Sequence, residues 1–241
     1  MRAGVMAAEL LEIVDRRRTA TREQATPAKV RLQSVASWNP ENFAREQIRR
    51  LVRQVFFSSA PQPKRHVLFS AVEPGADLGS ICLRVAQTLA METSAGVAVV
   101  GSIPQDADTL GSCLEDASDD SSDGSTLLRK MAMRLASNLW LLPDQSANAS
   151  HNSVSVAGFF GGLRSEFEYS IVQAPPAGES SRATEMAKAA DGLILVLSAQ
   201  HTRRASALRV KQMMEEAEVR ILGTVLTDRE FPIPERIYRR L

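Results

Sequence analysis

A glycine-containing turn at residues 70–81 is the segment best suited by composition to bind phosphate. Its sequence is SAVEPGADLGSI, and it joins an apolar run to an amphipathic one. In a turn from a strand into a helix, backbone N–H groups and the positive end of the helix point at the bound anion. The candidate positions are Gly75, Asp77, Leu78, Gly79 and Ser80. A turn of this kind is also common as a purely structural connection.

The turn lacks the cation that a nucleoside triphosphate requires. A phosphate-binding loop ends in Lys followed by Ser or Thr, because the lysine reaches the β- and γ-phosphates. Here Leu78 or Gly79 occupies the lysine position, and Asp77 adds a negative charge. Gly79 and Ser80 are retained, so we predict at most weak binding of ATP or ADP, without a well-held Mg²⁺.

Asp106 and Asp108 are the next candidates, because paired carboxylates can hold a divalent cation. They begin a segment, 106–125, that is acidic, rich in serine and punctuated by glycine. Further aspartates follow them, so a solvated acidic loop is favoured over a metal site. We assign no metal ligand and no catalytic residue.

The elements that would position these groups follow from the spacing of apolar residues. Short apolar runs predict strands at 66–72, 96–101, 139–143, 169–172, 192–199 and 219–227. Amphipathic runs predict helices at 43–57, 80–92, 127–136, 202–217 and a short one ending at 167. Strands that alternate with helices indicate an α/β fold with a mainly parallel central sheet and helices on both faces. Ligands of such folds bind at the carboxyl ends of the strands.

The composition of the chain argues against several other classes of protein. The 241 residues carry 29 Lys and Arg against 28 Asp and Glu, so we expect no nucleic-acid partner. Cys82 and Cys113 are isolated, which argues against a disulfide framework or a zinc site. No apolar run is long enough to span a bilayer, so we expect a cytoplasmic protein. Residues 1–40 are predicted to be an N-terminal helix and linker, and residues 41–241 the α/β domain.

Several ordered segments together resemble a known family. They are EQIR at 46–49, NLWLLP at 138–143, FEYSIVQAPP at 167–176, ADGLILV at 190–196 and LGTVLT at 222–227. Over roughly residues 40–230 the chain resembles the cytoplasmic bacterial tyrosine kinases of capsule and exopolysaccharide synthesis. These belong to the MinD/ParA-like group of P-loop NTPases, so the resemblance implies the P-loop NTPase fold.

The departures from that family concern its chemistry. The family's third motif has Asp before a small residue and two prolines, whereas here Gln173 precedes Ala174-Pro175-Pro176. The two aspartates that should end the second strand arrive late, as Asp106 and Asp108. The family's tyrosine-rich tail is replaced by a basic and apolar segment in which Tyr238 is the single tyrosine. The resemblance therefore implies a degenerate member without kinase activity.

The helix at 43–57 carries a second family feature. In the family, a Glu-x-x-Arg-x-x-Arg helix joins neighbouring subunits. Glu46 and Arg49 match this pattern, but Val52 takes the third position and Arg53 follows it. One residue turns a helix by about 100°, so Arg53 is not expected on the family's contact face. A homo-oligomer contact and a solvated basic face both remain open.

The resemblance implies a role in polysaccharide synthesis and export. We expect a regulator or scaffold that docks on a chain-length-determinant-type membrane protein or on a sister kinase. Such docking would place it peripherally at the inner membrane. The alternatives are an active tyrosine kinase or ATPase with a rearranged site, and a MinD/ParA-like positioning protein that responds to nucleotide.

Overall fold

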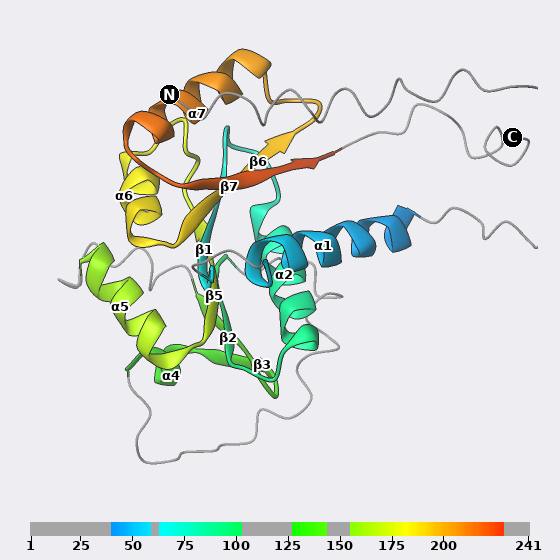
Figure 1. Ribbon diagram of the computed structural model, residues 1–241, viewed down its shortest axis with the longest axis vertical. Helices are drawn as coiled ribbons and strands as arrows, with labels where there is room; N and C mark the ends of the chain where they lie inside the picture. Colours follow the sequence, from blue (N-terminus) through cyan, green and yellow to red (C-terminus); the bar gives the residue numbers. More distant parts are fainter. Residues whose placement is uncertain (1–39, 59–62, 103–126, 144–154, 229–241) are drawn as a thin grey trace, which may run out of the picture. The chain divides into compact units, whose positions relative to one another are not determined.

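The computed structural model describes residues 40–58, 63–102, 127–143 and 155–228, which form one α/β unit (Figure 1). The chain divides into two units, Met1–Ser37 and Trp38–Leu241, and the first lies outside the described residues. So do the predicted N-terminal helix and linker, Asp106, Asp108 and the C-terminal segment. No helix in the described part has the length and apolarity needed to cross a bilayer.

A seven-stranded sheet with the order β3-β4-β2-β5-β1-β6-β7 forms the centre of this unit. The strands are β1 (His66–Ala71), β2 (Val97–Gly101), β3 (Met133–Ala136), β4 (Leu139–Pro143), β5 (Tyr169–Ala174), β6 (Gly192–Ser198) and β7 (Ile221–Thr227). Only β3 is antiparallel to its neighbour, and the other pairs are parallel. β1 is buried at all six positions, as expected for a strand covered on both faces.

Helices cover both faces of the sheet (Figure 1). One face carries α1 (Pro40–Phe56) and α2 (Leu78–Glu92), which pack around Val52, Phe56 and Leu89. The other carries α4 (Leu127–Met131), α5 (Val156–Glu166), α6 (Ser181–Ala189) and α7 (Arg204–Glu216), with Phe160 and Met214 in the core. Burial of these apolar side chains on both faces is the main force that holds the three layers together.

The prediction of one helix at 127–136 is wrong. The helix ends at Met131, and residues 133–136 form β3, which pairs with β4 and buries Leu135. Met, Arg, Leu and Ala all favour helix, but pairing with the sheet edge overrides that preference. α6 was not predicted, and β5 extends two residues further than expected, to Ala174, which brings Gln173 into the strand.

Candidate functional site

The candidate site lies where the carboxyl ends of β1, β2 and β5 meet the first turn of α2. A pocket of about 260 Å³ opens there. Among the residues that the structure describes, nine line this pocket, and all are uncharged: Ala71, Pro74, Gly75, Ala76, Leu78, Gln173, Ala174, Pro175 and Pro176. Of the predicted positions, Gly75, Leu78 and Gln173 line the pocket, whereas Asp77, Gly79 and Ser80 are not among its lining residues. The described part of the lining therefore offers no cation to neutralise a triphosphate.

The two residues that could correspond to the lysine, Leu78 and Gly79, are both closely packed against the rest of the domain. Leu78 is 5% exposed and belongs to the apolar core between α2 and the sheet. The following residue, Gly79, lies against β2, and a Cβ atom added there would be 3.1 Å from the carbonyl oxygen of Ser102. Neither position therefore carries a side chain that could reach a phosphate in the pocket.

Asp77 occupies the anion-binding end of α2. Its Oδ1 accepts a hydrogen bond from the backbone N–H of Ser80 at 3.1 Å, which makes Asp77 the N-cap of the helix. A carboxylate is stabilised at the positive end of a helix, and the same N–H groups would otherwise be free to bind phosphate. Glu73 adds a second negative charge to the loop, and no residue from Val72 to Ser80 is cationic. The loop thus repels a polyanion.

Gln173 is engaged with the end of β2. Its Oε1 accepts a hydrogen bond from the N–H of Ser102 at 3.1 Å, and its side chain packs so tightly on Gly101 that a Cβ there would collide with it. A neutral amide is a poor substitute for the carboxylate that Mg²⁺ prefers. Among the residues that the structure describes, no three His, Cys, Asp or Glu side chains are grouped to hold a metal ion. The described groups of this site do not fit a Mg²⁺-triphosphate.

Hydrogen bonds hold the loop after β5 against the end of β1 and against the turn at residues 70–81. Ser70 Oγ donates to the carbonyl of Pro175 at 2.6 Å, and the N–H of Ala177 donates to the carbonyl of Ala71 at 2.8 Å. The N–H of Gly178 reaches the carbonyl of Val72 at 3.2 Å, and a Cβ at Gly178 would lie only 2.7 Å from that oxygen. Sequence reasoning missed these contacts, although a glycine shortly after two prolines was a usable signal.

Cys82, near the same turn, is not a nucleophile. It is 1% exposed, and burial together with the negative charge of Asp77 raises the pKa of its thiol far above its ordinary value. A protonated, buried thiol is chemically inert. Its role is to fill the core between α2 and the sheet.

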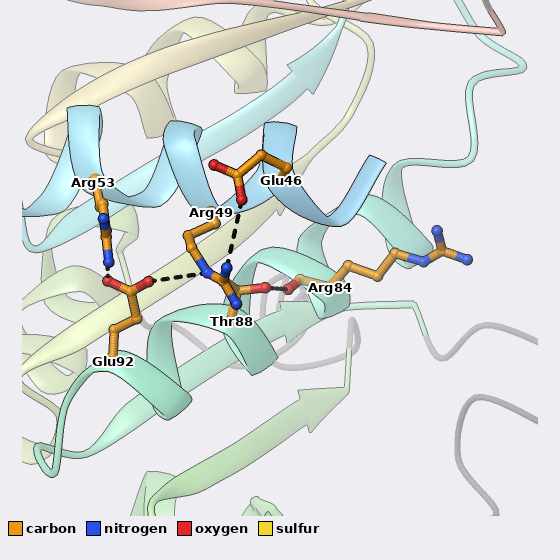
Figure 2. A network of polar contacts seen from close by, with 6 residues as sticks. All are labelled: Glu46, Arg49, Arg53, Arg84, Thr88 and Glu92. Atoms are coloured by element: carbon orange, nitrogen blue, oxygen red, sulfur yellow. Dashed lines mark hydrogen bonds and ion pairs between the residues drawn. The ribbon is translucent and has the colours of Figure 1, made fainter. Parts of the chain in front are cut away.

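The residues of α1 that were predicted to contact another subunit form ion pairs within this chain (Figure 2). Arg49 Nε lies 3.5 Å from Glu92 Oε1, and Arg53 Nε lies 3.2 Å from Glu92 Oε2, at the end of α2. Glu46 completes the network through Arg49 Nη1 at 3.5 Å. Arg49 and Arg53 are four residues apart and so share one face of α1, where both contact Glu92. The prediction that Arg53 lies off the face of Glu46 and Arg49 is therefore wrong. Their side chains nevertheless remain largely exposed, at 55% and 66%.

At the amino ends of the strands, the buried His66 and the half-buried Asp191 form a polar cluster. Asp191 Oδ2 accepts hydrogen bonds from the N–H groups of Arg65 and His66, both at 2.9 Å, and Oδ1 accepts from Arg164 at 3.1 Å. Burial alone would raise the pKa of Asp191, but these hydrogen bonds outweigh it and lower the pKa. His66 Nδ1 lies 2.9 Å from Ser170 Oγ. The cluster lies at the opposite edge from the pocket and ties β1 to β5 and β6.

Comparisons with known proteins give the fold but no closer relationship. No protein-family model matches the chain, and no curated protein matches its sequence. Among solved structures, it is similar to the chimerical protein CapA2B2, with 15% identity, a TM-score of 0.60, and coverage of 77% of this chain and 85% of the other. The kinase domain of the Escherichia coli tyrosine kinase ETK is 12% identical, with a TM-score of 0.58 and coverage of 79% of each chain. A ParA family ATPase from Chlorobium tepidum is 18% identical, with a TM-score of 0.51 and coverage of 68% and 73%.

These similarities confirm the predicted fold class. The chain has an α/β fold with a mainly parallel sheet between two layers of helices, and it shares this fold with CapA2B2, the ETK kinase domain and the ParA family ATPase. At identities this low, the likeness extends to the fold alone.

Proposed function

We propose that this chain is a non-catalytic, or at most weakly nucleotide-binding, relative of the exopolysaccharide tyrosine kinases. One observation carries the proposal: the strand-to-helix turn that should receive phosphate has its helix end capped by Asp77, at 3.1 Å from the N–H of Ser80. The neighbouring Leu78 is directed into the core. The loss of a charge-assisted contact to phosphate costs about 1.5–3 kcal/mol, or roughly ten- to a hundredfold in affinity.

Phosphoryl transfer requires more than binding. It depends on a cation and a metal that neutralise the developing charge on the γ-phosphate, held in a fixed geometry. The described part of the site supplies Gln173 in place of a carboxylate and two carboxylates in the loop in place of a lysine. We therefore expect neither autophosphorylation nor ATP hydrolysis. Asp106 and Asp108 lie outside the described residues and stay candidates only for the alternative of a rearranged active site.

A relative without catalytic activity would act by binding other proteins. We propose that the chain serves as a regulator or scaffold in polysaccharide synthesis and export, bound to a chain-length-determinant-type membrane protein or to a sister kinase. The likeness to the ETK kinase domain supports this assignment at the level of fold. The partner would place the chain at the inner face of the membrane.

Calorimetric titration of the purified chain with Mg-ATP tests the binding claim, and incubation with γ-labelled ATP tests the chemistry. We expect no saturable heat at millimolar nucleotide and no label on protein. Incorporated label that disappears in the Ser80→Ala or Asp106→Asn variant would establish the active-kinase alternative instead. Light scattering with and without nucleotide tests the third possibility: nucleotide-dependent self-association would indicate a MinD/ParA-like positioning protein.

The scaffold claim needs a separate measurement. The cytoplasmic segment of a chain-length-determinant-type protein encoded beside this gene should retain the chain in a pull-down without nucleotide. A sister kinase from the same gene cluster is the second bait. If neither retains the chain, or if the gene has no polysaccharide-export neighbours, the proposed role is wrong even where the lack of catalysis holds.

A further inference from the structure

The pocket at the carboxyl ends of the strands is small and has fixed walls. Its volume of about 260 Å³ is below the roughly 300–1,000 Å³ of pockets that hold drug-sized ligands. On one side, a hydrogen bond from Ser70 Oγ to the carbonyl of Pro175, at 2.6 Å, ties the loop after β5 to β1. On the other side, Gly75 has φ = 105°, and a Cβ built there would meet no described atom within 4 Å. The pocket is therefore suited to a compact ligand.

Most of the described lining is apolar and rigid. Three of its nine residues are prolines, whose rings fix the backbone φ angle and present a flat apolar surface. Small apolar side chains and one leucine complete this part of the wall: Ala71, Ala76, Ala174 and Leu78. Pockets of this kind hold an apolar body and orient it through a few polar groups. The ligand of this pocket should therefore have a flat, apolar body.

Gln173 supplies the polar side chain of the described lining, because the other eight residues are Gly, Ala, Pro or Leu. The N–H of Ser102 donates to one atom of its amide at 3.1 Å, so that atom is the oxygen, Oε1. The amide nitrogen, Nε2, is then left as a donor, and it has no acceptor among the described residues. The side chain thus offers a ligand a neutral hydrogen-bond donor.

A cationic ligand would lack acceptors in this pocket. The backbone carbonyls of four lining residues already accept hydrogen bonds within the domain, at 2.6–3.1 Å: Ala71, Ala76, Pro175 and Pro176. An ammonium or amidinium group must keep several donors satisfied, and a buried donor without an acceptor is destabilising. The described lining therefore favours a ligand that accepts hydrogen bonds over one that donates several.

An anionic ligand would meet negative charge at the same place. Glu73 and Asp77 lie in the turn that borders the pocket, and residues 72–80 contain no Lys or Arg. The chain that follows β2 adds none either, since residues 103–128 are free of both. Asp77 also occupies the N–H of Ser80 at the start of α2, at 3.1 Å. A carboxylate or phosphate would therefore find no charged partner among the described residues of the pocket and its turn.

We infer that this pocket binds a small uncharged molecule whose flat apolar body carries one hydrogen-bond acceptor, such as an amide carbonyl or a ring nitrogen. The acceptor pairs with Nε2 of Gln173, and the body lies against Pro74, Pro175 and Pro176. The inference rests on the proposed function, because the residues that exclude a triphosphate are the same ones that leave the pocket neutral. The ligand position at the carboxyl ends of the strands is thus kept, while the class of ligand differs.

Titration of the full isotope-labelled chain, followed by NMR, tests this inference with three probes. Benzamide, benzoate and benzamidine share one ring and differ in charge. Millimolar benzamide should shift the signals of the Gln173 side-chain amide and the Gly75 N–H saturably, whereas benzoate and benzamidine should bind at least about tenfold more weakly. The inference is overturned if either ion binds as tightly as benzamide, or if benzamide and nicotinamide both leave these signals unchanged.

Gln173→Glu isolates the donor, because the variant keeps an oxygen for the N–H of Ser102 and replaces only the NH₂ group. It should weaken benzamide binding about tenfold or more. Gln54→Glu, at an exposed position of α1, makes the same charge change away from the pocket and should leave the affinity unchanged. Unchanged amide signals of β1 in both variants show that the fold is intact. Equal benzamide affinity in Gln173→Glu and the unmodified chain would also overturn the inference.

Mg-ATP in the same titration separates two kinds of failure. Saturable shifts with Mg-ATP would contradict the proposed function. The failure of benzamide and nicotinamide, without any effect of Mg-ATP, overturns the class of ligand alone and leaves the lack of catalysis in place.

Discussion

Protonation of His66 should couple the stability of this fold to pH. The imidazole lies in β1 at 4% exposure, with Nδ1 2.9 Å from Ser170 Oγ. Burial is the main cause that lowers its pKa from 6.5 to about 4. The positive charges of Arg164 and Arg65 act in the same direction, and the nearby carboxylate of Asp191 offsets part of the effect. The folded protein therefore keeps His66 neutral at a pH where the unfolded chain binds a proton.

The sign and size of the effect follow from these values. The contribution is fully present above pH 6.5 and is lost as the pH falls from 6.5 to about 4, because only the unfolded chain gains the proton in that interval. One pKa unit corresponds to about 1.4 kcal/mol, so the free energy of unfolding should fall by about 3 kcal/mol between pH 6.5 and pH 4. Asp191 has a lowered pKa, so its contribution is lost as the pH falls through values below its ordinary 3.8, in a separate window.

Urea unfolding followed by circular dichroism between about pH 7 and pH 4 measures this loss. His66→Asn keeps a polar atom near Ser170 and removes the titration, so it should flatten the profile by about 3 kcal/mol relative to the unmodified chain. His201→Asn is the matched control, because its side chain is exposed in the folded state. Parallel profiles for the unmodified chain and His66→Asn, within about 0.5 kcal/mol, would refute the reasoning.

Three further predictions concern the site and α1. Asp77→Ala should cost about 1 kcal/mol of unfolding free energy in urea titrations, whereas Asp77→Ser, which retains a cap, should cost much less; equal costs would contradict the capping role. Glu92→Gln should lower the free energy of unfolding by about 1 kcal/mol or less, because its ion pairs with Arg49 and Arg53 are exposed. This loss should vanish at high salt, and a loss that does not depend on salt would contradict the ion-pair explanation. Gly101→Ala should cost about 1–3 kcal/mol through collision with Gln173. The double variant Gly101→Ala/Gln173→Ala should recover most of that loss, and simple additivity would rule the collision out.

The layers of the fold were predictable because they depend on local periodicity. The nearly continuous apolar run at 192–199 and the amphipathic run at 202–217 identify β6 and α7 within two residues of their ends. β3 was not predictable, since residues 133–136 prefer helix and become a strand only by pairing with β4. Local preference and tertiary pairing conflict there, and tertiary pairing decides.

The sequence shows which residue types occupy the motif positions of the candidate site, but not which contacts they make. The missing lysine and the substitution at Gln173 are visible in the sequence, since a motif fixes their positions. The hydrogen bond from Ser102 to Gln173 joins residues 71 apart, and it exists only because β2 and β5 are neighbours in the sheet. The same holds for Glu92, whose contact with Arg49 and Arg53 depends on how α1 packs on α2.

The close approach of α2 to β2 has a consequence for how this chain could change over time. A lysine at position 78 would replace a core leucine, and one at position 79 would press its Cβ against a backbone oxygen that cannot move aside as a flexible side chain would. A lysine at either position would therefore cost folding stability before it gained any affinity for ATP. A lysine in this turn would thus require compensating substitutions in the core or at the end of β2.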